Sequence, residues 1–162
     1  ITPVKQAVRR SIDKARAISR GLITVDLDEK GLVLAAKDFL REVQNVYGVR
    51  CIFTTPHDIS FHDHEQSIHL FRIMQEAVNN AVKHGKATTI GVSFARSRGR
   101  IRLTVQDDGV GFIPADTQDE GMGINIMKYR ADIIGADLFI QSREPGVEVS
   151  CEIDAGEDRY AQ

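Results

Sequence analysis

QEAVNNAVKHG, at residues 75–85, is the most informative stretch of the chain. Apolar residues in and before it recur at about 100° per residue, which predicts an amphipathic helix because they gather on one face. That face comprises Leu70, Met74, Ala77, Val78 and Ala81, with Phe71 and Val82 at its edge. The other side of the helix is polar, so the stretch combines a core-forming face with a face that is available for chemistry.

The polar side carries groups that can hold a metal ion and a phosphate chain. Glu76 and Asn80 lie one turn apart and project the same way. Lys83 and His84 add donors on the next turn, and Gly85 is where the helix is expected to end. An ordinary amphipathic helix with its polar side in water fits the same residues. This stretch alone therefore leaves both interpretations open.

Length and composition indicate one domain of ordinary character. The chain has 162 residues, a formal net charge of −2 and 42% hydrophobic residues, which suffices for a single core. No basic patch interleaved with aromatic residues occurs, so we expect no nucleic-acid partner. No apolar run reaches the roughly 20 residues that span a bilayer, so we expect no membrane contact by this domain. Cys51 and Cys151 lie in alternating runs and are expected to be buried thiols in a reducing compartment.

The remaining segments predict further helices and strands. Helices are predicted at 2–20, with a narrow apolar stripe that needs a partner, at 29–47 and at 124–134. The helix at 29–47 should direct Leu32, Leu34, Ala35, Phe39, Leu40 and Val43 inward. Strands are predicted at 49–54, 89–95, 101–105, 138–141 and 147–153. This order indicates a two-layer α/β sandwich with helices covering one face of a sheet.

Three histidines, His57, His62 and His64, raise the question of a metal site in the polar connector at 55–65. Their irregular spacing favours solvated loop residues, because a structural metal site usually shows regular ligand spacing and a fixed second shell.

The motif DDGVG, at residues 107–111, comes where a strand ends. On its own it predicts a turn. Asp107 can also accept a hydrogen bond from the exocyclic amine of a base. Gly109 and Gly111 would let the backbone lie against a flat ring where a Cβ would clash.

A second glycine motif, Gly121-Met122-Gly123, comes directly before a predicted helix. The N-terminus of such a helix offers unpaired backbone N–H groups and the positive end of its dipole to a phosphate. Each of the three motifs is a weak signal alone, whereas their joint order and spacing are specific.

Together these motifs resemble the ATP-binding catalytic domain of bacterial sensor histidine kinases. That domain belongs to a superfamily shared with gyrase, a heat-shock chaperone and a mismatch-repair ATPase. The resemblance is carried by QEAVNNAVKH at 75–84, DDGVGF at 107–112, GMGINIMKYRADIIGA at 121–136 and PGVEVSC at 145–151. It extends to the subgroup of nitrate/nitrite and cell-envelope sensors. It implies a Bergerat-type ATP-binding fold, in which helices cover one face of a mixed β-sheet, and a protein-histidine kinase that uses ATP and Mg²⁺.

The resemblance also implies roles for the residues of the first motif. Asn80 corresponds to the family's magnesium ligand, and Glu76 to the acidic position that polarises water or orders the metal shell. Lys83 and His84 match positions that approach the phosphates.

In the other motifs, Asp107 matches the residue that accepts a hydrogen bond from the adenine amino group. Gly109 and Gly111 would shape the base pocket, and Gly121 and Gly123 would lie beside the triphosphate. Residues 113–120 would form a short lid over the nucleotide.

The resemblance implies a division of the chain and a set of partners. Residues 1–20 would be the end of the second helix of a dimerisation hairpin, 21–155 the ATP-binding domain and 156–162 a tail. The family's acceptor histidine lies upstream of this domain, and we reject His62-Asp63 as acceptor because it lies in a connector. The expected partners are therefore the dimerisation and phospho-acceptor domain of the same full-length kinase and a response regulator. We expect the piece itself to be monomeric and cytoplasmic.

Two positions depart from the family pattern. A Gly-Thr pair, whose hydroxyl supports the adenine network, is replaced by Gly146-Val147. Ile124 replaces a leucine after the second glycine motif, which is a mild change.

Three other functions compete with a histidine kinase. A serine kinase of the anti-sigma-factor type carries a similar helix, but Lys83 and the helix at 2–20 argue against it. A gyrase-like or mismatch-repair clamp needs a longer lid than 113–120. A non-enzymatic nucleotide-binding module is kept open by Val147, while Glu76, Asn80 and Asp107 weigh against it.

Overall fold

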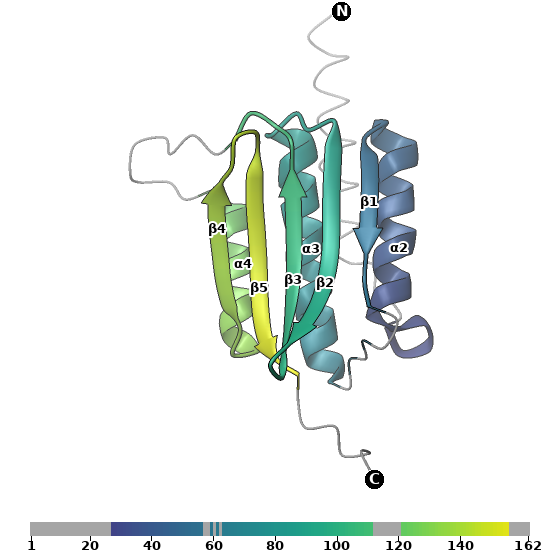
Figure 1. Cartoon of the computed structure of the whole chain (residues 1–162), viewed down its shortest axis with the longest axis vertical. Helices are drawn as coiled ribbons and strands as arrows, with labels where there is room; N and C mark the ends of the chain where they lie inside the picture. Colours follow the sequence, from purple (N-terminus) through teal and green to yellow (C-terminus); the bar gives the residue numbers. More distant parts are fainter. Residues whose placement is uncertain (1–26, 57–58, 60, 62, 112–120, 156–162) are drawn as a thin grey trace, which may run out of the picture.

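The computed structural model describes residues 27–56, 59, 61, 63–111 and 121–155. Its elements in chain order are α2 (Leu27–Tyr47), β1 (Arg50–Thr54), α3 (His64–Lys83), β2 (Thr89–Ser97), β3 (Arg100–Asp107), α4 (Met122–Ile133), β4 (Asp137–Ser142) and β5 (Val147–Asp154). Figure 1 shows the five strands side by side, with the helices behind them.

The strands form one mixed sheet in the order β1-β2-β3-β5-β4. β1 runs parallel to β2, and the other neighbours are antiparallel. A parallel pair needs a crossover connection, and α3 supplies it between β1 and β2. Because β3 pairs with β5 in opposite directions, the end of β3 and the start of β5 lie at the same end of the sheet.

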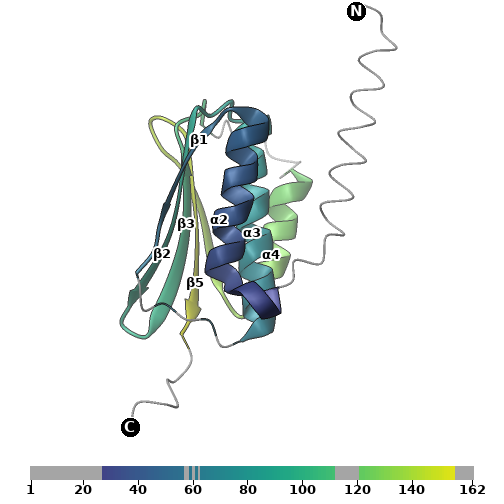
Figure 2. The same cartoon turned by 90° about the vertical axis from the view of Figure 1, so that its right-hand side faces the viewer.

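The helices α2, α3 and α4 cover one face of the sheet, as Figure 2 shows from the side. The predicted two-layer sandwich with a mixed sheet is confirmed. Alternate residues of each strand point to the helices and form the core, while their neighbours remain on the opposite, open face. The largest of the fully buried side chains in this core are Leu70, Ile73, Met74, Val78, Ile90, Val92, Leu103, Met127, Cys151 and Ile153.

α3 is the central helix, and both of its ends are defined by hydrogen bonds. At its start Asp63 is the N-cap, and its Oδ1 accepts a hydrogen bond from the backbone N–H of Gln66 at 3.0 Å. At its end the backbone N–H groups of His84 and Gly85 both donate to the carbonyl oxygen of Asn80, at 2.9 and 3.0 Å. The helix therefore ends at Lys83 with His84 as its C-cap, directly before the glycine that the sequence indicates.

The predicted elements are all present within the described residues, with corrected boundaries. The turn between β2 and β3 is only Arg98-Gly99, because Ser97 and Arg100 are already a paired position of the two strands. α4 begins at Met122, so Gly123 lies inside its first turn. Strand pairing extends β2 and β3, and an additional N-terminal turn extends α4, beyond what periodicity alone indicates.

The prediction that Leu34 faces the core is wrong, since its side chain is 45% exposed. Leu34 lies about 200° around the helix from the buried Leu32, on the opposite side. α2 is also interrupted at Gly31, whose φ of 68° and ψ of 160° are not helical.

The two cysteines are both free thiols. Cys151 is fully buried, and burial raises the pKa of its thiol to about 12, with Asp137 and Glu152 contributing. Cys51 is only half-buried, which corrects the prediction for that residue, and burial raises its pKa as well.

Four predictions lie outside the described residues. They are the helix at 2–20, the lid at 113–120, the tail at 156–162 and the placement of His57 and His62. Across the ranges that are described, no helix combines the length and hydropathy needed to cross a membrane.

Candidate functional site

A hollow of about 480 Å³ opens between α3, α4 and the helix-facing side of the sheet. Its polar wall is α3, which contributes Glu76, Asn80 and His84. Its other residues are Gly121, Met122, Gly123, Ile124 and Met127 from the region of α4, and Ile140 and Val149 from β4 and β5. The wall formed by α3 is thus suited to a polar or charged ligand group. The apolar floor, formed by Met127, Ile140 and Val149, is suited to a flat apolar group.

Gly123 brings the first and third motifs into direct contact. A Cβ built on Gly123 would overlap Oε1 of Glu76 and lie 3.3 Å from Nδ2 of Asn80. The backbone of α4 therefore passes directly beside both polar side chains of α3. By contrast, a Cβ on Gly121 would meet no atom within 4 Å. Of the two glycines in this motif, only Gly123 is needed for the close approach.

The N-terminus of α4 lines the hollow with four consecutive residues, 121–124. Gly121 is the N-cap and has no side chain to satisfy the first backbone N–H groups of the helix. Such a helix end presents N–H donors and a partial positive charge to an anion. This places an anion-favouring dipole next to Glu76 and Asn80.

Asp107 lies beyond the apolar floor, at the end of β3. Val149, which lines the hollow, is paired with Val105, and Asp107 is two residues further along the same face of β3. Its carboxyl group is buried, and Oδ1 accepts a hydrogen bond from the backbone N–H of Gly109 at 2.8 Å.

Two glycines make room for this carboxyl group. A Cβ on Gly146 would overlap the backbone oxygen of Asp107 and lie 2.8 Å from its Oδ1. A Cβ on Gly109 would overlap the carbonyl of Gly85 and also lie 2.8 Å from Oδ1 of Asp107. Gly111 lies nearby, since a Cβ there would be 3.5 Å from the carbonyl oxygen of Gly146. The environment of Asp107 is therefore built almost entirely from backbone.

The first and second motifs are also joined by the backbone. The N–H of Val110 donates to the carbonyl oxygen of Gly85 at 2.9 Å. The glycine that ends α3 thus anchors the loop that follows Asp107. A change at the end of α3 would therefore be transmitted directly to the loop that follows Asp107.

Asp108 holds the same loop from the other side. Its carboxylate accepts hydrogen bonds from the backbone N–H groups of Thr88 and Thr89, at 2.7 and 2.8 Å, and from Oγ1 of Thr88 at 2.6 Å. These hydrogen bonds, that of the Thr88 side chain first, lower the pKa of Asp108 to about 2. Three donors on one carboxylate fix the start of β2 to the residue next to Asp107.

The predicted site residues fall into three groups: those that line the hollow, those that lie beside it, and Lys83, which is not among the lining residues. Glu76, Asn80, His84, Gly121 and Gly123 line one hollow, and Asp107, Gly109 and Gly111 lie together beside it. Lys83 is exposed and is not among the lining residues.

Sequence reasoning missed the apolar floor and the residues that support the loop after Asp107. Met127, Ile140 and Val149 look like ordinary core positions in the sequence, and only the packing of α4 over β4 and β5 identifies them. Gly146 is visible in the sequence as the glycine of the family's Gly-Thr position, but its close contact with Asp107 is not. Val147, the departure from the family's threonine, packs against the hydrophobic core.

Comparison with known families identifies the chain. The model of the family described as "Histidine kinase-, DNA gyrase B-, and HSP90-like ATPase" matches residues 65–157, more than half of the chain. The chain belongs to this ATPase family. The matched segment contains all three motifs of the site, so the resemblance inferred from them is confirmed.

Two curated relatives show the branch of the family. The oxygen sensor histidine kinase NreB of Staphylococcus carnosus is 28% identical over 152 residues, covering 93% of this chain and 44% of its own length. The nitrate/nitrite sensor protein NarX of Escherichia coli K12 is 31% identical over 144 residues, covering 86% of this chain and 24% of its own. The chain therefore spans less than half the length of these relatives and is homologous to the catalytic domains of sensor histidine kinases.

Solved structures agree on the fold. A histidine kinase domain from the blue-light activated kinase EL346 of Erythrobacter litoralis superposes with a TM-score of 0.66, at 19% identity over 80% of this chain and 68% of that one. The catalytic domain of histidine kinase ThkA gives a TM-score of 0.63, at 19% identity over 80% of this chain and 93% of that one. Both confirm the fold, a mixed sheet covered on one face by helices.

Proposed function

We propose that this chain is the catalytic domain of a sensor histidine kinase. It would bind Mg-ATP and transfer the γ-phosphoryl group to a histidine on a dimerisation domain, for relay to a response regulator. Use of ATP favours the cytoplasm as its location. The observation that carries the proposal is the convergence on one hollow of the acidic and amide side chains of α3 and the N-terminus of α4, with Asp107 beside its apolar floor.

Each part of the site matches one part of the nucleotide. The adenine ring would lie over the floor formed by Ile140 and Val149, with its amino group donating to the second carboxylate oxygen of Asp107. The phosphates would lie toward the N-terminus of α4, where backbone N–H groups are available. His84 lines the same wall and would approach the phosphates, while Lys83 would have to reach them from an exposed position.

The residues beside Gly123 fit a magnesium ion. Glu76 and Asn80 provide oxygen donors at the same edge of the hollow, where the absence of a Cβ on Gly123 leaves room. Magnesium prefers oxygen ligands and usually takes only one or two from the protein. Nδ2 of Asn80 faces Gly123, which leaves Oδ1 as the atom for a metal ion. When bound, the ion would neutralise charge on the phosphates.

The chain's own contribution to phosphoryl transfer is positioning and electrostatics. The reaction needs an in-line approach and neutralised charge, and it needs little covalent chemistry from the protein. Glu76 would order water or the metal shell, and the α4 dipole would stabilise negative charge. This chain supplies no acceptor histidine in the proposal, so the acceptor must come to the mouth of the hollow.

A surface for that acceptor lies on α4. Met122, Ile126, Tyr129 and Ile133 are 80, 39, 67 and 41% exposed and share one stripe, because they are spaced by four, three and four residues. The stripe starts at Met122, which also lines the hollow. A helix of the acceptor domain packed along this stripe would bring its histidine to the phosphate end of the site.

Calorimetric titration with a non-hydrolysable ATP analogue, with and without magnesium, tests the nucleotide site. We expect magnesium-assisted binding that prefers adenine to guanine and weakens about tenfold or more in Asp107→Asn, because a buried hydrogen bond to the base is lost. Asp154→Asn is the matched control, since Asp154 lies at the far end of β5 and is exposed. Equal affinity in wild type and Asp107→Asn would remove the proposed role of Asp107.

Phosphotransfer distinguishes the kinase from its alternatives. With a separate dimerisation domain as acceptor, we expect labelling on histidine that falls in Asn80→Ala together with the magnesium dependence of binding. Labelling on serine of a protein partner would favour the serine-kinase alternative. Nucleotide binding without any transfer would favour a non-enzymatic module.

A further inference from the structure

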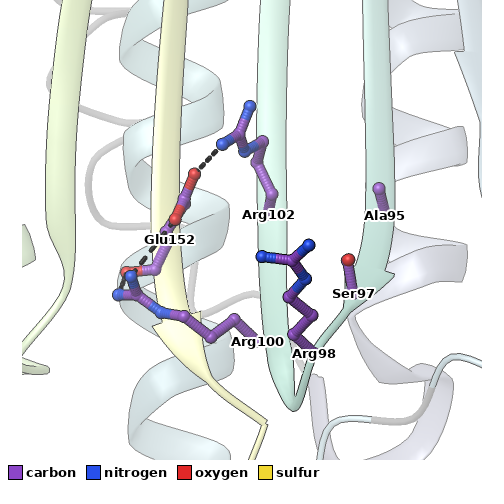
Figure 3. A pocket seen from close by; sticks show the side chains of 6 residues that line it. All are labelled: Ala95, Ser97, Arg98, Arg100, Arg102 and Glu152. Carbon is purple, nitrogen blue, oxygen red and sulfur yellow. Dashed lines mark hydrogen bonds and ion pairs between the residues drawn. The ribbon is translucent and has the colours of Figure 1, made fainter.

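A second hollow lies on the open face of the sheet, on the side away from the helices. Its volume is about 550 Å³, and it is lined by Ala95, Ser97, Arg98, Arg100, Arg102 and Glu152 (Figure 3). It forms because the outward-facing residues of β2 are small, while long arginine side chains rise from the neighbouring turn and strand. Three of its six lining residues are cationic.

Arg100 and Arg102 are held in place by acidic side chains. Arg100 pairs with Asp137 at 2.6 Å, with Glu152 at 3.2 Å and with Asp154 at 3.5 Å. Arg102 contacts the other oxygen of Glu152 through Nη2. Figure 3 shows both side chains reaching toward Glu152. Arg100 is therefore neutralised, whereas Arg102 shares Glu152 with Arg100 and keeps further N–H donors.

Arg98 differs from both. Among the described residues no carboxylate pairs with it, and Figure 3 draws no interaction between it and the other lining residues. Its side chain lines the hollow beside Ser97, whose hydroxyl is a further donor. The hollow thus contains a guanidinium without an anionic partner in the described part of the chain.

The backbone at Arg98 is unfavourable for an arginine. Arg98 and Gly99 form the two-residue turn between β2 and β3, with φ values of 51° and 75°. Such a turn needs positive φ at both positions and strongly prefers Asn-Gly. A long side chain kept in a left-handed conformation has a local cost, which points to a use for that side chain.

From these observations we infer that the hollow binds an oxyanion, either a phosphate group or the carboxylate of an acidic protein side chain. Arg98 would be the main donor, with Arg102 and the hydroxyl of Ser97 beside it. Guanidinium groups suit both anions, because their parallel N–H donors match two oxygens at once. The site faces away from the nucleotide hollow and is independent of the proposed kinase activity.

The test is an NMR titration of the full chain with inorganic phosphate and, separately, with a glutamate-rich peptide. We expect saturable shifts of the backbone amides of Ala95, Ser97 and Arg102. Residue-resolved shifts separate this site from any phosphate bound beside α4. Peptide binding tighter than phosphate would identify a protein side chain as the ligand, and the reverse would identify a small anion.

The decisive variant is Arg98→Asn, which removes the charge and introduces the residue that this turn prefers. It is expected to fold, with a raised melting temperature, and to bind both probes about tenfold more weakly. Arg143→Gln is the matched control, because Arg143 is an exposed arginine that pairs with Glu148 elsewhere on the chain. Equal shifts in wild type and Arg98→Asn, or no saturable shift with either probe, would overturn the inference.

Discussion

The two faces of the sheet are built on opposite principles. On the helix-covered face, the hollow between α3 and α4 and the adjoining surroundings of Asp107 are shaped by the absence of side chains, because Gly109, Gly123 and Gly146 all lie where a Cβ would overlap another group. On the open face, the second hollow, lined by Arg98, Arg100 and Arg102, is shaped by long side chains beside small ones. Arg100 is held there by three carboxylates.

This difference has a physical origin. A site inside the layered structure must be shaped by close backbone approach, since close packing leaves no room for adjustment. A site on an exposed sheet can be shaped by ion pairs, which solvent screens and which tolerate substitution. We therefore expect substitutions on the helix-covered side to be costly and specific, and substitutions on the open side to be mild.

The largest effect is expected from Gly146→Ala. The added Cβ would overlap the backbone of Asp107, and the φ of 92° is unfavourable for alanine. We expect the free energy of unfolding to fall by about 3 kcal/mol, measured by urea denaturation. Gly135→Ala is the control, because Gly135 also has positive φ, 62°, but has no atom near its Cβ position. It should cost about 1 kcal/mol. Similar losses in both variants would mean that strain, and not the contact with Asp107, determines the result.

A smaller and more specific effect is expected from Gly123→Ala. The new Cβ would displace the flexible end of Glu76, so the fold should survive while the metal and phosphate end of the proposed nucleotide site is disturbed. We expect affinity for magnesium and an ATP analogue to fall about tenfold by calorimetry, with little change in unfolding. Gly121→Ala, in the same motif but facing open space, should bind almost as wild type does. A greater loss in Gly121→Ala would show that loop flexibility matters more than the contact with Glu76.

The smallest effect is expected from Asp108, the residue next to Asp107 on the helix-covered side. In the folded protein the pKa of Asp108 is lowered from the usual value of 3.8 to about 2, so its carboxylate stays ionised at a lower pH than in the unfolded chain. A lowered folded-state pKa gives stability that is present above about pH 4 and lost as the pH falls toward 2. We expect the melting temperature of wild type to fall more steeply over that interval than that of Asp108→Asn, whose side chain does not titrate.

The same pair of variants measures the structural role of Asp108 at neutral pH. Asn can accept the two backbone hydrogen bonds from Thr88 and Thr89, so Asp108→Asn should remain close to wild type, while Asp108→Ala should melt lower. Identical acid profiles for wild type and Asp108→Asn would argue that the three hydrogen bonds do not stabilise the ionised carboxylate.

Much of the fold could be predicted because periodicity is a local property. The apolar face of α3 and the alternation of β5 follow from residue spacing alone, and both elements occur where they are expected. Leu34 was misplaced because an apolar residue on a helix does not reveal which neighbours are available to bury it. The ends of β2 and β3 were set too short because pairing with a neighbouring strand, which spacing does not encode, extends them.

The candidate site divides in the same way. The motifs around Asn80, Asp107 and Gly123 are visible in sequence because their chemistry requires particular residue types at fixed spacing. The role of Gly146 beside Asp107, and that of Asp108 across from Thr88, depend on contacts between segments that lie far apart in the chain.

The family, the layered α/β architecture and the three motifs follow from the sequence alone, because each is encoded in residues close together along the chain. The folded structure was needed to show which glycines lie where a Cβ would overlap a neighbour, that Lys83 is not among the residues lining the hollow, and that no carboxylate among the described residues pairs with Arg98. Those properties depend on the distances that folding sets between β3, β5, α3 and α4. A one-dimensional pattern does not contain such distances.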